Sequence, residues 1–531
     1  MSARIYLDYA ATTPVDARIA AEMHACLTAE GDFANPASAT HQSGRRARAR
    51  IERARAEVAS LIGALPSEII FTSGATESDN LAILGVARAS AHRGRHIVTS
   101  RIEHRAVLDP CRQLQKEGFE VTYLQPDGAG RIAPENLAAA LRDDTVLVSL
   151  MHVNNEIGVI QDIGAFAKLC AARDIPLHSD AAQSVGKIGL DVRAVPISFL
   201  SFTAHKIYGP KGIGALFVRN DSRARLAPLV FGGGQERGLR AGTLPTHQIV
   251  GFAAACMLAR QDSGRARRLE ILRNRLWGRL AALGGVHLNG EGAPRSAEIL
   301  SVSFEGVEGE SLITGLTELA VATGSACSSA SAEPSYVLRA LGRSSARAQS
   351  TLRLSLGCGT TEDDIDRSAQ AISREVRRLR AISPDELLQN IATDADTIDE
   401  DDATIEFDIL SPEARRLFTR LPGAGALEGP GVVRGEAGNA AAEAWVRFHL
   451  RIAEGTVRDA RFQAYGCPHT LAVAAWLTRD LPGRPLCALA LGAPADWARA
   501  LEVPVEKLGR LLVVEDALQA CLERAEKVVE W

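Results

Sequence analysis

Ser201-Phe-Thr-Ala-His-Lys-Ile-Tyr-Gly-Pro-Lys-Gly212 is the stretch of sequence that decides the fold and the chemistry of this chain. The apolar run from Ile197 to Phe202 predicts a buried strand that ends in a polar turn carrying His205 and Lys206. The glycines and the proline that follow let the backbone pass close to a ligand. A lysine at a strand end, beside a histidine and a hydroxyl, suits a Schiff base with an aldehyde cofactor. Since most lysines are solvated surface charges, this prediction depends on the other groups that such a cofactor needs.

The same strand-and-turn pattern repeats between about residues 50 and 260. Short β-branched runs alternate there with helical stretches rich in Ala, Leu and Arg. The strands are expected at Glu68–Phe71, His96–Thr99, Thr145–Ser149, Ile175–His178 and Gly214–Val218. This alternation predicts an α/β fold with a mostly parallel sheet and helices on both faces. Ligands of such sheets bind beyond the carboxyl ends of the strands.

The following segment has a different pattern. A long charged helix is expected over Gly264–Leu283, and a separate strand over Glu298–Phe304. Residues 261–385, together with residues 1–13, are therefore expected to form a smaller α+β domain beside a large domain of about residues 14–260.

The C-terminal part of the chain is set apart by an acidic segment. Eight acidic residues and no basic one lie between Asp394 and Asp408, which predicts a solvated linker over residues 386–404. Residues 405–531 form a further α+β module, in which Val446–Ile452 and Val457–Ala464 are expected to be neighbouring strands.

Length and composition restrict the class of protein. A chain of 531 residues, 46% apolar and 23% charged, is typical of a multidomain globular protein. The net charge of −4 gives no indication of direct nucleic-acid binding. No apolar run is long enough to span a membrane and the N-terminus lacks a signal pattern, so we expect a cytoplasmic protein. The nine cysteines lack Cys-x-x-Cys spacing, so neither a metal site nor a disulfide framework is predicted.

Pyridoxal phosphate needs a lysine for its aldehyde, a carboxylate for its ring nitrogen and an anion cradle for its phosphate. Asp180, just past a strand end, is the candidate carboxylate, although it could also be a helix N-cap. Gln183 could donate to the phenolic oxygen of the ring. Ala75 and Thr76 begin a helix after Gly74, and a free helix N-terminus binds phosphate, although a capped helix start would look the same.

Other polar residues follow the same strand ends. His104 could stack on the ring and exchange protons, or be a structural histidine, and Asn155 could contact the substrate. Further phosphate donors are predicted at Thr203, His205 and Thr243. Five such motifs at one edge of a sheet are improbable as independent accidents.

Together these segments resemble the cysteine desulfurases of the NifS/IscS kind, which have the class V aminotransferase fold (fold type I of pyridoxal phosphate enzymes). The resemblance runs to about residue 385. The matching motifs are Ile5–Pro14, Asn35–Ser38, Thr72–Asn80, His178–Gln183, Ala204–Gly212, Arg240–Thr243, Thr323–Ser331 and Glu333–Leu341.

The resemblance implies conversion of L-cysteine to L-alanine, with Cys327 accepting the sulfur as a persulfide. Small residues around Cys327 suit a mobile loop, although such a cysteine could also sit in a tight core corner. Lys206 and His104 would move protons, and Arg353 would hold the substrate carboxylate. Sulfur would pass to an iron–sulfur scaffold protein or a tRNA-thiolation enzyme. A homodimer is also implied, with Thr243 serving the partner's phosphate site.

One position departs from the family. After Ser355-Leu-Gly357 the IscS-type relatives usually carry a basic residue, whereas this chain has Cys358. Any role of that residue in charge or acceptor docking is therefore absent here, although the chemistry should be unaffected.

The C-terminal module resembles the IscU/NifU-type iron–sulfur scaffold through Glu454–Cys467 and Glu515–Leu518. Only Cys467 of the family's ligands is present. The first cysteine and its aspartate correspond to Ala442 and Ala444, and the third cysteine falls near Arg510. A single thiolate cannot hold a cluster, so we expect a degenerate scaffold. Cys467 could accept sulfur from Cys327, or the module could be only a docking domain; His469 and Cys487 do not restore the pattern.

Two other functions remain open. A selenocysteine or cystine lyase would use the same cofactor with less dependence on Cys327. A non-catalytic fusion protein would have a vestigial cofactor site, but the complete set of lysine, aspartate, histidine and cysteine argues against it.

Overall fold

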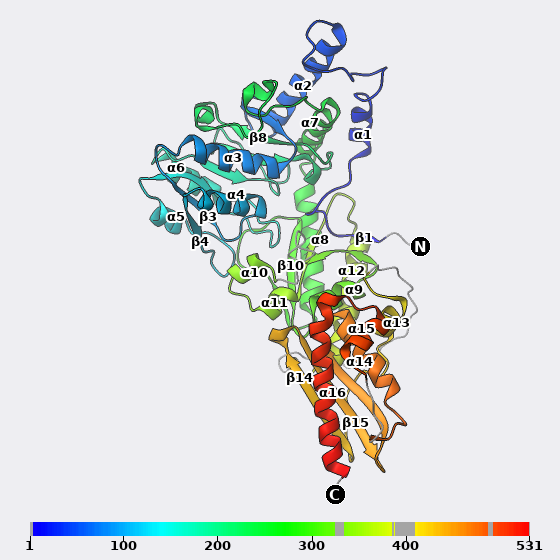
Figure 1. Cartoon of the computed structure of the whole chain (residues 1–531). Helices are drawn as coiled ribbons and strands as arrows, with labels where there is room; N and C mark the ends of the chain where they lie inside the picture. The colour runs from blue at the N-terminus through cyan, green and yellow to red at the C-terminus, as the bar shows by residue number, and fades with distance from the viewer. Residues whose placement is uncertain (1–3, 324–333, 385–386, 388–408, 487–491, 530–531) are drawn as a thin grey trace.

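The computed structural model of the chain (Figure 1) describes residues 4–323, 334–384, 387, 409–486 and 492–529. Cys327 and Cys487 lie outside these residues, as does the acidic linker expected over residues 386–404, apart from Leu387. No helix in the described ranges is both long and apolar enough to cross a membrane.

The large domain is built on a seven-stranded sheet, and the alternating pattern of the sequence correctly predicted it. β8 is antiparallel to both of its neighbours, and the other pairs of neighbouring strands are parallel. All strands except β4 are fully buried, because helices cover both faces. In sheet order the strands are β2 (Ile69–Thr72), β8 (Gly214–Val218), β7 (Phe199–Thr203), β6 (Leu177–Asp180), β5 (Thr145–Ser149), β3 (His96–Ser100) and β4 (Glu120–Leu124).

Two hydrophobic cores lie on the two faces of this sheet. The alternation is clear along β2, where Ile69 and Phe71 join one core and Ile70 joins the other. The first core is covered by α1 (Ala17–His24), α2 (Gln42–Leu61), α5 (Pro134–Ala140), α6 (Ile163–Ala171) and α7 (Thr246–Gln261). The second is covered by α3 (Ala75–Ala89) and α4 (Arg105–Lys116).

The small domain contains an antiparallel sheet and a two-stranded parallel pair. The charged helix expected over Gly264–Leu283 is α8, and the strand expected over Glu298–Phe304 is β10. The sheet has the order β12 (Ala322–Thr323), β13 (Thr351–Ser355), β10 (Ile299–Phe304) and β9 (Val286–Leu288), and the pair is β1 (Ile5–Tyr6) with β11 (Leu319–Ala320). The helices are α8 (Arg265–Ala281), α9 (Gly309–Gly315), α10 (Tyr336–Ala340), α11 (Ser345–Gln349) and α12 (Glu362–Ile382).

The C-terminal module is a three-stranded antiparallel sheet packed against helices. The two strands expected from the sequence are β15 (Ala444–Ala453) and β16 (Thr456–Tyr465), joined by a tight turn. The edge strand β14 (Val432–Asn439) was not predicted, because its glycines resemble turn signals. The helices are α13 (Pro412–Arg420), α14 (Pro468–Asp480), α15 (Pro494–Leu501) and α16 (Leu508–Val529).

Gly435 explains the irregular sequence of β14. A Cβ at this position would lie 2.0 Å from the backbone nitrogen of Cys521 in α16. The glycine therefore lets the long C-terminal helix lie directly on the strand, which no larger residue would allow.

The small domain and the C-terminal module share one continuous hydrophobic core. It joins Leu312 and Leu316 of the small-domain side to Val446 and Leu471 of the C-terminal side. Figure 1 shows the C-terminal module below the small domain, away from the large domain. The module is thus a packed extension of the small domain.

Candidate active site

The polar residues that follow the strands gather at one edge of the large-domain sheet. Asp180 ends β6, and Lys206 ends a short 3-10 turn directly after β7. His104 follows β3, and Asn155 follows β5. Since β2 runs in the same direction as β7, the start of α3 also lies at this edge. The fold therefore brings together the residues that the sequence singled out.

The start of α3 has the form of an anion cradle. The helix begins at Ala75, and its N-cap Gly74 provides no side-chain cap for the free backbone N–H groups. Thr203 lies beside this turn: its Oγ1 would be 4.0 Å from a Cβ built on Gly74. The Thr203 hydroxyl donates to the carbonyl of Ile213 at 3.2 Å, so its own lone pairs remain available as acceptors only. The exposed Thr76 completes the turn.

The glycine-rich turn that carries Thr243 is fixed by buried charges. Glu236, with φ of 47°, accepts two hydrogen bonds from Arg55 at 2.7 and 2.8 Å. Arg240 pairs with Glu77 in the first turn of α3 at 2.8 Å. These pairs hold the loop against the cradle, and Thr243 itself is exposed on the surface of the chain.

His104 is held as a neutral imidazole. Its Nδ1 accepts a hydrogen bond from the backbone N–H of Ala106 at 3.1 Å, so the ring proton is on Nε2. Burial lowers the pKa of His104, the carboxylate of Asp180 opposes this effect, and the charge of Lys206 adds to it. A neutral ring between a carboxylate and a lysine can accept or return a proton.

His205 is also neutral. Burial and the nearby lysines, Lys206 first, lower its pKa to about 4. Its Nδ1 lies 3.2 Å from the hydroxyl of Thr12, and its carbonyl accepts from Thr13. The histidine thus connects the lysine turn to the N-terminal segment.

Asp180 and Gln183 are buried and oriented by neighbouring groups. The carboxylate of Asp180 accepts from the N–H of Ala182 at 2.9 Å. The amide nitrogen of Gln183 donates to the carbonyl of Ala10 at 2.8 Å, and its oxygen accepts from Lys187 at 3.3 Å. An ammonium can only donate, so Lys187 fixes which way the Gln183 amide points.

Two further buried carboxyl groups, which sequence reasoning missed, lie beside Asp180. Burial, and then repulsion from Asp180, raise the pKa of Asp79 well above its usual range. Neither carboxyl oxygen of Asp79 has a hydrogen-bond partner within the described residues, and one lies 3.4 Å from His178. Burial raises the pKa of Glu103 to about 8. Burial therefore favours the neutral form of both carboxyl groups.

The signal for these two residues was in the sequence. Asp79 lies in the 72–80 motif and Glu103 directly precedes His104. The sequence could not show that Asp180 lies close to both residues, because Asp180 belongs to a different strand.

Arg353 lies in β13, where it faces the loop after β5. Its guanidinium donates to the backbone carbonyl of Asn155 at 3.2 Å and pairs with Asp8 at 2.8 Å. Its Nε is buried without a hydrogen-bond partner in the described part of the chain. Glu156 is also buried, and burial raises its pKa to about 7 although the charge of Arg353 opposes this. Arg353 and Asn155 are thus adjacent, through the backbone of Asn155.

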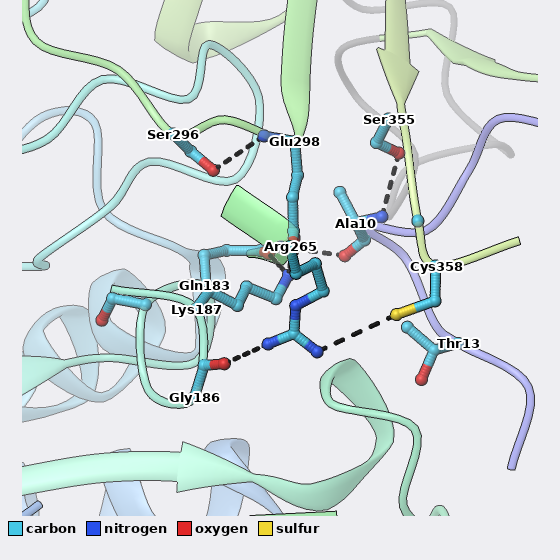
Figure 2. Close-up of polar contacts among 12 residues, drawn as sticks. Ala10, Thr13, Gln183, Gly186, Lys187, Arg265, Ser296, Glu298, Ser355 and Cys358 are labelled. Carbon is cyan, nitrogen blue, oxygen red and sulfur yellow. Dashed lines mark hydrogen bonds and ion pairs between the residues drawn. The ribbon is translucent and has the colours of Figure 1, made fainter. Parts of the chain in front are cut away.

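The two domains of the catalytic region meet at a charged junction, drawn in Figure 2. Lys187 of the large domain pairs with Glu298 of the small domain at 2.7 Å, and both side chains are buried. Arg265 donates to the carbonyl of Gly186 and lies 3.9 Å from the sulfur of the exposed Cys358. Cys358 thus stands at the domain junction.

Cys467 is completely buried at the start of α14, 3.4 Å from the hydroxyl of Thr470. No group of three or more His, Cys, Asp or Glu side chains could hold a metal ion among the residues that the structure describes.

Two family models match the chain. The model described as aminotransferase class-V matches residues 5–367, and the model described as NifU-like N terminal domain matches residues 416–528. The sequence motifs had indicated both families.

Curated relatives and solved structures agree with the first match. The chain is 55% identical over 385 residues to "Cysteine desulfurase IscS" of Aeromonas hydrophila, covering 72% of this chain and 95% of the relative. The protein of the same name from Enterobacter sp. is 54% identical with the same coverage. Among solved structures, a "NIFS-like protein" is 37% identical with a TM-score of 0.65, over 70% of this chain and 98% of that one. DndA from Streptomyces lividans is 43% identical with a TM-score of 0.56, over 66% and 99%.

Proposed function

The chain belongs to the aminotransferase class V family as a cysteine desulfurase with a NifU-like domain, and from this premise we propose how its residues act. L-Cysteine reacts with the thiol of Cys327 to give L-alanine and a persulfide on Cys327. The atoms balance without an external oxidant, because the sulfur leaves carbon and joins sulfur while two protons return to the product. The observation that carries this proposal is the set of strand-end residues, assembled around Asp180 and Lys206.

The cofactor of this family is pyridoxal phosphate, and the residues present fit it. The cofactor supplies an electron sink for the bond that breaks at the substrate's α-carbon. The uncapped start of α3 at Ala75 and Thr76 suits its phosphate, together with His205. Thr203 would join them only if its hydroxyl turned from the carbonyl of Ile213 to the phosphate. Asp180 would hold the ring nitrogen, with Gln183 at the phenolic oxygen. Burial raises the pKa of its neighbours Asp79 and Glu103 and so favours their neutral forms.

Proton transfer falls to two residues. Lys206 would hold the cofactor's aldehyde carbon at rest and take the α-proton of the substrate once displaced. His104 would stack on the ring and exchange protons at Nε2, since its Nδ1 already accepts from Ala106. Its neutral state suits a group that must both accept and return a proton.

Substrate binding falls to Arg353 and Asn155. A guanidinium forms two parallel hydrogen bonds with a carboxylate. Arg353 is buried and paired with Asp8, so the substrate carboxylate would share or replace that partner. The unsatisfied Nε of Arg353 is a donor that such a carboxylate could use.

A selenocysteine or cystine lyase is the alternative, and one variant distinguishes the two. Alanine formation from L-cysteine should collapse in Cys327→Ser if Cys327 accepts the sulfur. A lyase would keep most of its activity in that variant. Mass spectrometry of the intact protein after turnover should find one added sulfur on Cys327.

The persulfide would be passed to an acceptor, either an iron–sulfur scaffold protein or a tRNA-thiolation enzyme.

We propose a homodimer in which the exposed Thr243 serves the partner's phosphate site, and a cytoplasmic location. The seven described cysteines are all unpaired, which suits a reducing compartment. Gel filtration at several protein concentrations tests the dimer, and loss of cofactor affinity in Thr243→Ala tests the shared site.

Cys467 is proposed as an internal acceptor. Transfer would be attack of its thiolate on the outer sulfur of the Cys327 persulfide, releasing the Cys327 thiolate. Fusion in one chain raises the effective concentration of the acceptor. Peptide mapping after turnover should find added sulfur on Cys467; modification of Cys327 alone would favour a docking domain.

A further inference from the structure

The junction between the C-terminal module and the small domain contains a largely buried arginine, Arg510, near the position of a cluster ligand in the scaffold family. We propose that Arg510 replaces the metal of the ancestral site and closes that site as an ion-pair latch between the two domains. The C-terminal module is then a fixed domain that binds no metal at this place, and sulfur can reach the buried Cys467 only when the joint opens locally.

The fold brings the former ligand positions together. In the β15–β16 ladder Trp445 lies opposite Tyr465, so Ala444 lies beside the turn that leads to Cys467. Arg510, in the first turn of α16, contacts the thiol of Cys467 and the carboxylate of Glu443. Glu443 stands between the two alanines that replace a cysteine and an aspartate. The guanidinium therefore lies against Cys467 and against the residue between the two alanines.

Charge explains why a guanidinium suits this space. The Arg510 side chain is only 15% exposed, and the Cys467 sulfur and the neighbouring carboxylates raise its pKa although burial opposes them. Its Nη2 donates to Glu443, and its Nη1 lies 3.9 Å from both Glu308 and Glu310. A cation here offsets the neighbouring carboxyl groups, as a metal ion would, although burial raises the pKa of Glu308 to about 7. Removing it would leave those groups uncompensated.

The partners of this cation come from both sides of the domain boundary. Glu308 is the N-cap of α9 in the small domain, and Gln349 at the end of α11 donates to Glu443. Lys507 pairs with Glu310 at 2.6 Å, and the hydroxyl of Ser311 donates to the carbonyl of Gly466 at 2.7 Å. These polar bonds lie beside the apolar core that runs through both domains. A large apolar interface with buried polar bonds is typical of a fixed joint.

Thiol labelling tests the latch in the full-length holoenzyme. Cys467 is completely buried and Cys358 is exposed, so Cys358 is an internal control for reagent reactivity. With iodoacetamide and peptide mass spectrometry, Cys467 in the wild type should be protected. In Arg510→Ala the labelling of Cys467 should accelerate about tenfold or more, because the free energy of the local opening that exposes its thiol becomes smaller. The labelling rate of Cys358 should not change.

Two more variants separate the latch from general damage. Arg458→Ala removes an exposed arginine that pairs with Glu454 inside the same module, and it should leave Cys467 protected. Glu443→Gln keeps the size of the side chain and should accelerate labelling in the same direction as Arg510→Ala. Unchanged protection of Cys467 in both Arg510→Ala and Glu443→Gln would overturn the latch.

Zinc binding tests the replacement of the metal. Equilibrium dialysis with Zn²⁺ should give the same bound metal for the wild type and for Cys467→Ser. The triple variant A442C/A444D/R510C should gain stoichiometric Zn²⁺ that a further Cys467→Ser change removes. Zinc bound to the wild type and lost in Cys467→Ser would overturn the proposal, as would a folded triple variant that gains none.

Discussion

The catalytic region and the C-terminal module differ in what surrounds their inherited sites. Around Asp180 the described residues include buried carboxyl oxygens of Asp79 and Glu103 with no hydrogen-bond partner. Around Cys467 an arginine and two carboxylates form a set of ion pairs, and two ligand positions are alanines. The first site keeps polar groups that suit a bound cofactor, whereas the second is filled by the chain itself.

The module keeps its fold although it has lost the ligands of its site. The module keeps the core that packs it on the small domain, because Leu471 and Val446 belong to the same apolar cluster as Leu312. Its ligands are not needed for that packing and can be replaced by residues that strengthen the joint. A domain can therefore keep its packing interface after the ligands of its site have been lost.

The largest expected effect is in the catalytic region. Lys206→Ala should lower alanine formation on the order of 10³-fold or more, because both the attachment of the cofactor and the main proton acceptor are lost. The visible absorbance of the lysine-bound cofactor should disappear with it. A visible band that persists unchanged in Lys206→Ala would show that the cofactor attaches elsewhere.

The next effect separates two buried carboxyl groups that the sequence does not distinguish. Asp180→Asn should lower alanine formation on the order of 10²-fold, since the charge at the ring nitrogen is lost. Asp79→Asn should keep activity within about threefold, because burial and Asp180 raise the pKa of Asp79 and an amide resembles the neutral carboxyl group that this favours. Steady-state kinetics of both variants give the ratio of their rates of alanine formation. Equal losses would mean that the charge is shared between the two positions.

The sequence predicted the strand-end residues well, and the reason is local. Apolar runs such as Thr145–Ser149 identify strands, and the polar residues after them fall at one edge in any parallel sheet. The raised pKa of Asp79 was not predictable, since it depends on burial and on Asp180 from a different strand. The pairing of Arg510 with Glu308 was not predictable either, because Glu308 lies far from it in the sequence and in another domain. The edge strand β14 was missed because Gly435 serves the packing of α16.

A smaller effect, on stability, should follow from the protonation of Glu103. Burial raises its pKa from an ordinary value of 4.5 to about 8. The folded state therefore binds a proton that the unfolded state has released, and stability falls as the pH rises from about 4.5 through about 8. In Glu103→Gln this loss, a few kcal/mol at most, should be absent.

Denaturant unfolding of the cofactor-free protein between pH 5 and pH 8.5 measures the slope for the wild type and Glu103→Gln. Glu117→Gln is a matched control, because this glutamate lies on the surface and its pKa is lowered by Arg88. A wild type and a Glu103→Gln variant with parallel pH profiles would contradict a protonated Glu103.

The smallest expected effect is that of Cys467→Ser, in the C-terminal module, on alanine formation. Cys467→Ser should leave kcat and KM for alanine formation within about twofold of the wild type, because Cys467 is buried against Arg510, away from the strand ends that form the active site. The serine also keeps the contact with Thr470. Steady-state rates at saturating and limiting cysteine measure both constants, with Cys521→Ser as a second buried thiol in the same module. A fall in kcat in Cys467→Ser but not in Cys521→Ser would mean that sulfur leaves Cys327 through Cys467 in every turnover. The two regions would then form one catalytic unit.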